Sequence, residues 1–479
     1  MIPLSFGQNR LWLLDQFEGT GWTYNGVVQV RLRGLLDVTA LDAAVSDVLK
    51  RHEVLRTVFP GDDGTPRQEV LPHHRGLAPL TVVDVPPGGL DALLERSARR
   101  PFRLTDEIAF TATLFTVSPR EHVLHLVMHH IVMDGWSVRP LMRDLALAYT
   151  ARRGGGAPQW EPLPVQYSEF ARWQRDTLGE ATDPGSLLSE QLDHWRAALA
   201  AMPEEMVLPA DRARPDTPSY RGASVPFVID AGLHRRLLDL ARESRATLFM
   251  VTHAALGALF GRLGAGDDIP VGTSVAGRLD EALDDLVGFF VNTVVLRTDV
   301  SGNPTVRELI GRVRDTDLAA FDQQEAPFDA VVEAIAPRRV FGRHPLAQTM
   351  LAIHSFQPPA PDFPGLDVEV GDGGHIERHS AKFDLYFDLT ETWDSDGGPA
   401  GVRGELKYAT DLWDEGSARS LAERFALTLT AMAAGPHRLV SDLDLLSERE
   451  RLLVTAGPAR VLDRRLRLLP PGVPGELYL

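Results

Sequence analysis

The side chains in this sequence that are best suited to chemistry lie in one short run, HHIVMDGWS, from His129 to Ser137. It holds two adjacent imidazoles, His129 and His130, and a carboxylate, Asp134, four residues after the second. Imidazole is the side chain that gains and loses a proton near neutral pH. This run is therefore where acid–base chemistry is expected.

The residues before the histidines predict the strand that positions them. Residues 123–128 are mostly β-favouring, and side chains on a strand alternate between its two faces. His130 then shares a face with Leu126, while His129 shares the other with His125. The two imidazoles are expected to point in opposite directions, so that His130 faces whatever lies across from the strand end.

The residues after the histidines predict a turn and then a helix. Asp134 and Gly135 are turn residues, Ser137 is placed to cap, and Leu141 and Leu145 recur at helical spacing. A lone histidine on an apolar strand is more often a satisfied core residue than a catalyst. The motif alone leaves both interpretations open.

Composition narrows the class of protein. At 479 residues the chain exceeds the size of one hydrophobic core, which favours two lobes, and 44% hydrophobic with 24% charged residues is ordinary for a globular protein. The net charge of −17 argues against nucleic acid as a partner. The absence of cysteine excludes disulfides, thiolate metal sites and a cysteine nucleophile.

Targeting signals are not evident in the sequence. No apolar stretch approaches the roughly 20 residues that a membrane span needs. The opening MIPLSFGQNR lacks the charged-then-apolar order of a signal peptide. We expect a cytoplasmic protein that does not associate with membranes.

Strands and helices alternate on both sides of a proline-rich stretch. Strands are expected at 82–85 and 109–117 with a helix at 90–98 between them, and Thr39 with Asp42 predicts the capping box of an earlier helix. Residues 203–221 contain four prolines and predict a linker. These features indicate an α+β fold.

Seven segments, in order, resemble the core motifs of the condensation domains of nonribosomal peptide synthetases, over about Leu4 to Leu446. Chloramphenicol acetyltransferase and other CoA-dependent acyltransferases share the shorter core His-x-x-x-Asp-Gly. The segments are PLSFGQNRLWLLDQF from Pro3, RHEVLRTVF from Arg51, HHIVMDGWS from His129, VQYSEFARWQ from Val165, LVGFFVNTVVLR from Leu286, QQEAPFD from Gln323 and RHPLAQTMLAIHSF from Arg343.

Four places depart from the family's usual pattern. Gly7 stands where alanine is commoner, and Gln323 replaces a titratable histidine, so we give Gln323 no catalytic role. Ala347 replaces a frequent aromatic residue, and His354 with Ser355 replaces Gln-Asn. The last two changes are expected to reshape the pocket.

The resemblance implies an α+β fold of two chloramphenicol-acetyltransferase-like lobes in a pseudo-dimeric V with a central tunnel. The expected division is an N-terminal lobe at 1–175, an inter-lobe helix and connection at 176–204, and a C-terminal lobe at 205–446. Residues 447–479 are expected to be a linker followed by a segment that resembles part of an adenylation domain.

The implied activity is that of an acyltransferase that forms amide bonds. The amine of an acceptor aminoacyl thioester attacks a donor peptidyl or aminoacyl thioester, as in the biosynthesis of antibiotics and siderophores. Both substrates ride on phosphopantetheine arms of carrier proteins, one upstream and one downstream, so the chain needs no cofactor of its own and no metal. PLSF, the DPGSLLSEQLDHWRAAL insertion and GRHPLAQTML resemble the subtype with a D-configured donor and an L-configured acceptor. That subtype implies an upstream epimerising domain, and we expect a monomer.

The resemblance also implies roles for site residues. His130 is the expected base or positioner of the amine, and the sequence leaves both roles open. His129 and Gly135 are grouped with it as catalytic residues; Gly135 permits the turn and can offer its backbone N–H to the developing oxyanion. Trp136, Ser137, Asn292 and Ser355 are expected to line the substrate tunnel.

Asp134 is expected to be structural, because a buried carboxylate needs a cationic partner. Arg278 is the first candidate partner, and Arg297 and Arg56 are the alternatives.

Four other functions are open to a chain with these motifs. A CoA-dependent acyltransferase shares the shorter motif but lacks the other six. A non-catalytic recruitment domain of the same fold usually loses the second histidine or the glycine, and this chain keeps both His130 and Gly135. An epimerase of the same fold differs around the fifth motif. A condensation variant that also dehydrates or otherwise modifies its substrate fits the same residues.

Overall fold

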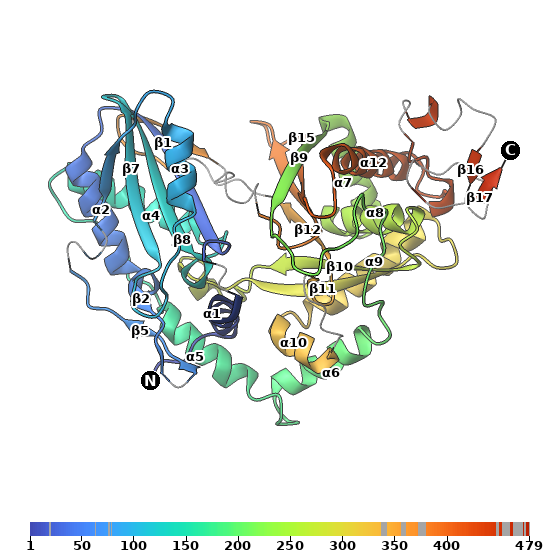
Figure 1. The fold of residues 1–479 in the computed structure, drawn as a ribbon, viewed down its shortest axis with the longest axis horizontal. Coiled ribbons are helices and arrows are strands. Elements are labelled where there is room, and N and C mark those ends of the chain that lie inside the picture. Colours follow the sequence, from blue (N-terminus) through green and yellow to red (C-terminus); the bar gives the residue numbers. More distant parts are fainter. Residues whose placement is uncertain are drawn as a thin grey trace.

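A computed structural model gives the fold, and it describes residues 1–18, 21–62, 64–74, 77, 79–336, 343–355, 361–371, 380–446, 450–452, 460–462, 473 and 476–478. Figure 1 shows two halves, each built on its own β-sheet, that are joined at one end and diverge in a V. The expected fold class, α+β with two lobes, is confirmed.

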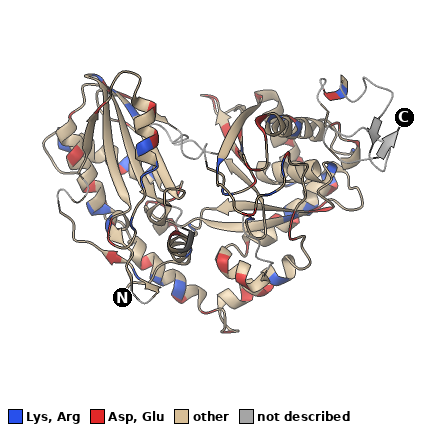
Figure 2. Ribbon diagram, viewed as in Figure 1, with Lys and Arg blue, Asp and Glu red and all other residues tan. Residues whose placement is uncertain are grey.

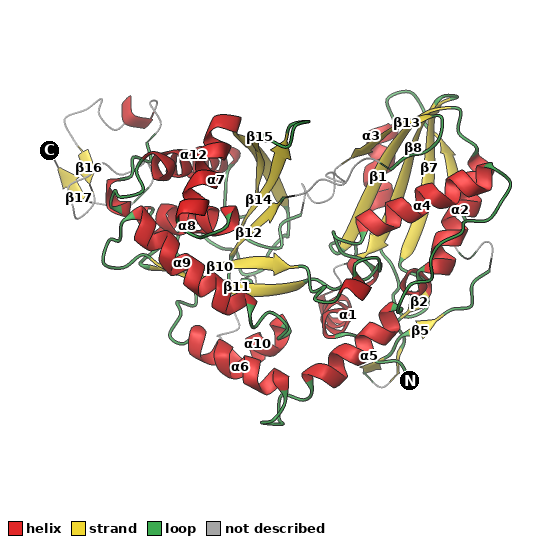
Figure 3. Cartoon of the chain, turned by 180° about the vertical axis from the view of Figure 1, so that it is seen from behind, coloured by secondary structure: helices red, strands yellow, loops and turns green. Residues whose placement is uncertain are grey.

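The sheet of the first half has five strands in the order β13-β1-β8-β7-β6. Helices α2 and α4 cover one face and α3 lies on the other (Figure 3). The central strand β8 is buried on both faces, which explains its nearly continuous apolar sequence. These elements are β1 (Asn25–Gly34), α2 (Val38–Arg51), β6 (Thr81–Asp84), α3 (Leu90–Ala98), β7 (Phe110–Ser118), β8 (Glu121–His129), α4 (Val138–Arg153) and β13 (Leu366–Gly371).

The edge strand β13 comes from far along the chain. It pairs antiparallel with β1, with Val370 opposite Val30 and Leu366 opposite Gly34. The expected division at 1–175 and 205–446 is therefore wrong for this strand, because residues 366–371 complete the sheet of the first half.

The sheet of the second half has six strands in the order β11-β10-β12-β14-β15-β9. Helix α8 is buried beneath it, and the side chain of Thr247 accepts a hydrogen bond from the backbone N–H of Met250. These elements are β9 (Gly222–Ile229), α7 (Ala231–Glu243), α8 (Leu248–Arg262), β10 (Asp268–Val275), β11 (Asn292–Asp299), α9 (Val306–Phe321), β12 (Thr349–His354), β14 (Leu385–Trp393), β15 (Pro399–Ala409) and α12 (Glu415–Ala434).

The remaining helices lie where the two halves join. Helices α1 (Phe6–Glu18), α5 (Tyr167–Leu178), α6 (Leu187–Ala198) and α10 (Phe328–Ile335) run along this end in Figure 1. Helix α1 packs against the short 3-10 turn His130–Val132, and Gln8 donates to the carbonyl of Ile131 at 3.1 Å. The junction therefore supports the histidine motif directly.

Short elements complete the fold. They are the 3-10 turns Glu53–Arg56, Glu281–Leu283 and Val440–Asp442, and the strands β2 (Thr57–Val58), β3 (Gly61–Asp62), β4 (Thr65–Pro66), β5 (Glu69–Val70), β16 (Arg460–Leu462) and β17 (Glu476–Tyr478). The last two pair antiparallel. Most of residues 447–479 lie outside the described residues, and so does most of the segment expected to resemble an adenylation domain.

One local expectation is corrected. The cap of α2 is Asp37, whose carboxylate accepts from the N–H of Ala40 at 2.9 Å, whereas Asp42 accepts from the N–H of Leu80. In α5, Tyr167 is buried in the core, but Trp173 is 46% exposed.

Charged residues are most frequent in the helices and loops, and most of the strand length is uncharged (Figure 2). In the part of the chain that the structure describes, no helix is long and apolar enough to cross a membrane.

Candidate active site at the junction of the two halves

His130 lies at the end of β8, where the chain leaves the sheet and enters the 3-10 turn. Its backbone N–H donates to the carbonyl of Tyr24 at 2.7 Å, and its Nδ1 lies 3.2 Å from the carbonyl oxygen of Met133. Because a carbonyl oxygen can only accept, Nδ1 carries the hydrogen in this contact. In the neutral ring Nε2 is then the basic nitrogen, as a general base requires.

His129 points into the first half and is 2% exposed. Its Nδ1 accepts a hydrogen bond from the N–H of Ile131 at 3.1 Å, which fixes the turn that presents His130. Burial, with smaller contributions from the neighbouring charges of His130 and Lys382, lowers the pKa of His129 to about 3. The sequence groups His129 with the catalytic residues, but its buried place behind the turn makes it a positioning residue.

Asp134 is buried and accepts four hydrogen bonds. Oδ1 accepts from the N–H and the hydroxyl of Ser137, at 2.9 and 2.8 Å. Oδ2 accepts from the N–H of Phe290 and from Nη1 of Arg278, both at 3.0 Å. These bonds satisfy the lone pairs of the carboxylate and tie the first half to the segment that precedes β11.

Arg278 is the cation that pairs with Asp134, and its side chain is 5% exposed. Its Nη2 donates to the carbonyl of Leu286, and the guanidinium lies 4.0 Å from the centre of the Phe290 ring. The two alternative partners are placed elsewhere. Arg297 pairs with Asp268 at 2.7 Å. Arg56 pairs with Glu53 at 3.1 Å, so neither belongs at this site.

Ser137 precedes α4, but its side chain makes no capping hydrogen bond. Its hydroxyl instead lies 2.8 Å from Oδ1 of Asp134 and 2.9 Å from the carbonyl oxygen of Gly288, and it accepts from the N–H of Gly288 at 3.1 Å. Ser137 is fully buried, so the expectation that it caps the helix and lines the tunnel is wrong. It joins the two halves.

Gly135 does not have a positive φ, so the turn does not require glycine. A Cβ added at this position would meet no atom within 4 Å. The explanation of Gly135 as a turn former is therefore wrong, and what glycine provides here is open space beside the backbone of the motif. Trp136, the next residue, is 41% exposed and does not line the pocket described below.

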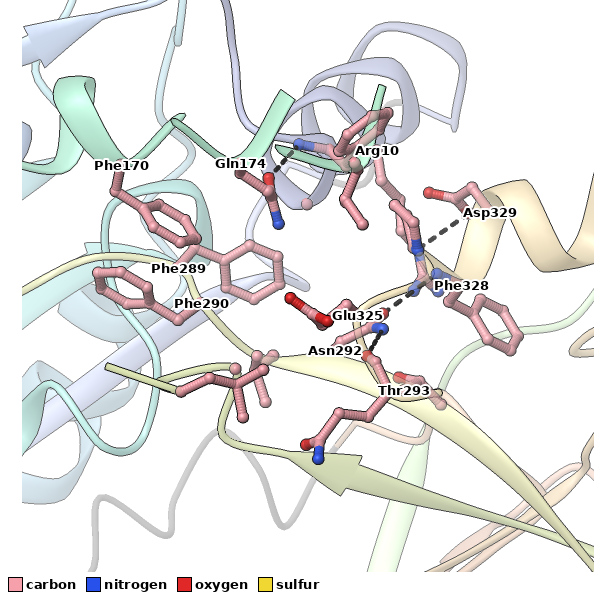
Figure 4. A pocket seen from close by; sticks show the side chains of 18 of the residues that line it. Arg10, Phe170, Gln174, Phe289, Phe290, Asn292, Thr293, Glu325, Phe328 and Asp329 are labelled. Atoms are coloured by element: carbon pink, nitrogen blue, oxygen red, sulfur yellow. Dashed lines mark hydrogen bonds and ion pairs between the residues drawn. The ribbon is translucent and has the colours of Figure 1, made fainter. Parts of the chain in front are cut away.

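A pocket lies between the two halves, close to the motif (Figure 4). Its wall is mixed: Phe170, Phe289 and Phe290 line one end, and at the other end Arg10 and Asp329 form an ion pair at 3.5 Å. The lining residues are Phe6, Gly7, Arg10, Phe170, Trp173, Gln174, Thr177, Leu178, Gly277, Leu279, Phe289, Phe290, Val291, Asn292, Thr293, Gln324, Glu325, Pro327, Phe328 and Asp329.

Asn292 lines this pocket and shapes it. Its Nδ2 donates to the carbonyls of Gln324 and Ala326, at 2.8 and 2.7 Å, and its Oδ1 accepts from the N–H of Phe328. Asn292 therefore holds the 324–328 loop as the pocket's wall. Ser355, the other expected tunnel residue of the second half, is exposed just after β12 and is outside the lining of this pocket.

Sequence reasoning missed the two residues that connect the pocket to the motif. The ring of Phe289 lines the pocket and lies 6.2 Å, centre to centre, from the ring of His130. The hydroxyl of Tyr167 donates to the carbonyl of Phe289 at 2.5 Å, and burial raises the pKa of Tyr167. The only signal for either residue was its place in a motif, because an aromatic residue among apolar neighbours predicts core.

Among the residues that the structure describes, no group of three or more His, Cys, Asp or Glu side chains could hold a metal ion.

Comparison with known proteins gives consistent matches. Residues 1–454 match the family described as the condensation domain. The chain is 49% identical over 456 residues to the probable nonribosomal peptide synthetase CymA of Salinispora arenicola, covering 95% of this chain and 6% of that protein. It is 45% identical over 451 residues to a dimodular nonribosomal peptide synthase of Bacillus subtilis, covering 94% and 19%. The chain thus spans less than a fifth of either relative.

Solved structures give the same result. The X-domain in its complex with OxyB from teicoplanin biosynthesis is 37% identical, with a TM-score of 0.85, and the match covers 93% of this chain and 96% of that one. These matches agree with the fold and with the turn that carries His130. The chain belongs to the condensation-domain family of nonribosomal peptide synthetases.

Proposed function

We propose that this chain is an acyltransferase that forms a peptide bond between two thioesters carried on phosphopantetheine arms of carrier proteins. The observation that carries the proposal is the arrangement of His130, whose Nδ1 is engaged with the carbonyl of Met133 so that Nε2 is the basic nitrogen. This imidazole stands beside Phe289, at the junction between the two halves.

In the proposed reaction the acceptor amine attacks the carbonyl carbon of the donor thioester. A C–N bond forms, the C–S bond breaks, and the amine loses one proton while the departing sulfur gains one. Because a thioester is already activated, holding both substrates in line contributes most, about 7 to 11 kcal/mol for well-aligned reactants. His130 accepts the amine proton at Nε2 or positions the amine, and general-base help is worth about 10²- to 10⁴-fold.

The open space beside Gly135 is where the developing oxyanion can approach the backbone. A Cβ there would meet nothing within 4 Å, so the carbonyl of a substrate has room to reach the N–H of this residue. The buried Asp134–Arg278 pair acts indirectly, because it fixes the turn against the segment before β11.

The test is a condensation assay with two carrier proteins, one loaded with a donor aminoacyl group and one with an acceptor. The expected product is an acceptor carrier whose intact mass has increased by the donor acyl group. Omitting the chain, or using an N-acetylated acceptor amine, should remove this product. If no donor–acceptor pair yields it, the proposed activity is wrong. Loss of one water from the product would instead indicate the dehydrating variant.

A second candidate is a recruitment domain, and the likeness to the teicoplanin X-domain, solved together with OxyB, favours it. The retention of His130 and Gly135 favours condensation instead. A chain that binds a partner enzyme from its own gene cluster in size-exclusion chromatography, yet forms no amide with any loaded pair, would support recruitment. An active chain would exclude recruitment as its main role.

We also propose that the donor is D-configured and the acceptor L-configured, and that an epimerising domain acts upstream. A site shaped for one configuration misplaces the carbonyl of the other, and an error of about 1 Å can cost roughly 10²-fold in rate. The rate with a D-terminated donor should exceed that of its L-epimer at equal loading. Equal rates would remove the stereochemical proposal and leave the condensation proposal intact.

The other features of the proposal follow the family resemblance. The chain acts as a cytoplasmic monomer, without a cofactor of its own, between an upstream and a downstream carrier protein. Residues 1–175 together with β13 form one lobe, 176–204 connect, and the rest of 205–446 forms the other. The hairpin β16–β17 belongs to a segment derived from an adenylation domain.

A further inference from the structure

The backbone around Phe289 is tied to the first half on both sides. Gly288 exchanges hydrogen bonds with the hydroxyl of Ser137, at 3.1 and 2.9 Å. The carbonyl of Phe289 accepts from Tyr167 at 2.5 Å, and the N–H of Phe290 donates to Asp134 at 3.0 Å. The main chain therefore cannot shift without breaking buried hydrogen bonds, and the side chain of Phe289 is the part that can move.

The ring of Phe289 packs against the start of α1 at Gly7. A Cβ added to Gly7 would lie 2.9 Å from both Cδ1 and Cε1 of this ring, which is closer than carbon atoms pack. The ring thus occupies the room that the missing side chain leaves. This explains the first departure from the family's pattern, where alanine is commoner than glycine.

On its other side the ring meets the place where chemistry is proposed. It lies 6.2 Å from the ring of His130, centre to centre, and also forms part of the pocket wall (Figure 4). Phe6, Phe170 and Phe290 continue this wall, so the pocket is apolar near the motif. The ion pair of Arg10 and Asp329 lies at its other end.

We propose that Phe289 is a specificity-determining residue whose ring limits the space between His130 and the pocket. Because position 7 is glycine, this ring can lie against α1, and the site then has room for a bulky, apolar side chain beside the reacting carbon. This inference rests on the proposed condensation activity. An alanine at position 7 would push the ring away from α1, and the open volume on that side is the pocket. The space for the substrate would shrink.

The effect should depend on the size of the substrate. Discrimination by one methylene group in an apolar pocket is worth about 10- to 200-fold, and displacing a reacting group by about 1 Å costs roughly 10²-fold. Gly7→Ala should therefore lower kcat/KM about 10-fold or more for leucyl or phenylalanyl thioesters. A glycyl thioester should lose less than about 3-fold, because it does not reach the displaced ring.

The experiment compares wild type, Gly7→Ala, Phe289→Leu and the double variant, with Gly311→Ala as a matched control. Gly311 lies in α9, where a Cβ meets nothing within 4 Å. Carriers loaded with glycine, leucine or phenylalanine are tested first as donors against a glycyl acceptor and then as acceptors against a glycyl donor. Initial rates are measured by intact mass, and melting temperatures identify variants that fail to fold.

The expected result is a size-dependent loss in Gly7→Ala in at least one of the two series. This loss should largely disappear in the double variant, because leucine removes the ring that the new methyl group would strike. A uniform loss for all side chains, no change in either series, or an equal loss in the Phe289→Leu background would overturn the inference. If wild type forms no amide, the proposed activity fails instead, so the two failures are distinguishable.

Discussion

Among the described residues, the junction and the interior of the second half each bring histidine, a carboxylate and a hydroxyl together, and the two places differ in access. At the junction, Asp134 and Ser137 bind each other and the second half, while His130 stands beside them. Inside the second half, Thr298 Oγ1 lies 2.9 Å from Nε2 of His253, whose Nδ1 lies 3.0 Å from Asp317.

The buried group has the hydroxyl–imidazole–carboxylate order of a nucleophilic triad, yet its three residues are at most 1% exposed. No substrate can reach them in this conformation. At the junction the His130 ring lies 6.2 Å, centre to centre, from the ring of Phe289, which lines a pocket. Access and location therefore decide which group can be catalytic, and the order of hydrogen bonds does not.

The largest expected effect is that of His130→Ala. It should lower the rate of amide formation by about 10²- to 10⁴-fold, because it removes the basic nitrogen nearest the reaction. Its melting temperature should remain close to that of wild type, since the ring is only partly buried. His253→Ala is the comparison variant. We expect it to lower the melting temperature and to leave the rate per folded molecule close to that of wild type. An active, stable His130→Ala chain would contradict the assignment.

Asp134→Ala should lower both stability and activity. Removing one partner of a buried ion pair typically costs about 3 to 5 kcal/mol of unfolding free energy, because Arg278 keeps its charge in a buried place. Urea unfolding measures this loss. Adding Arg278→Met should recover part of it. Glu53→Ala, which breaks the more exposed pair with Arg56, is the matched control and should cost about 0 to 1 kcal/mol.

Asp317→Asn should lower stability by about 1.5 to 3 kcal/mol, because a hydrogen bond to a buried charged group is weakened. The rate per folded molecule should stay within about 2-fold of wild type if this group has no part in the chemistry. The fraction of folded protein is measured by circular dichroism in the same samples. A rate that falls far more than the folded fraction would mean that the second group affects the site.

The last prediction concerns the pH dependence of stability. Burial lowers the pKa of His129 to about 3 in the folded chain, against 6.5 for the free side chain. Below pH 6.5 the unfolded chain therefore binds a proton that the folded chain does not. The stability from neutral His129 is complete above pH 6.5 and is lost as pH falls toward 3, by at most about 1.4 kcal/mol per unit.

The test is the pH dependence of urea unfolding between pH 7.5 and 4.5. The slope should be shallower in His129→Asn, whose amide oxygen can still accept from the N–H of Ile131. An unchanged slope would mean that His129 does not set this dependence.

The sequence predicts much of this arrangement because the relevant signals are local. The β-favouring residues before the motif place β8, with His129 at its end and His130 directly after it. A buried carboxylate at Asp134 requires a cation, and Arg278 is the one at the end of a strand in the second half.

Features that depend on contacts between distant residues were not predictable. The local sequence offers two caps for α2: Asp37, or Thr39 together with Asp42. Which of them caps the helix depends on Leu80, whose N–H binds Asp42 and leaves Asp37 as the cap. The sequence around Ser137 predicts a helix cap, but its hydroxyl binds the carbonyl of Gly288 in the other half instead. The Phe289 ring occupies the room that Gly7 leaves, and a contact between residues so far apart in the sequence produces no periodic pattern.

The pairing of β13 with β1 has a consequence for how the chain is made. The ribosome completes Gly34 roughly 330 residues before Leu366, its partner in the finished sheet. At about 5 to 20 residues per second, the edge of β1 waits roughly 20 to 60 seconds for its neighbour. During that time one edge of β1, with arginines at positions 31 and 33, has no neighbouring strand. Charged side chains on such an edge oppose pairing with another chain, and this is the effect we expect of the two arginines before β13 is made.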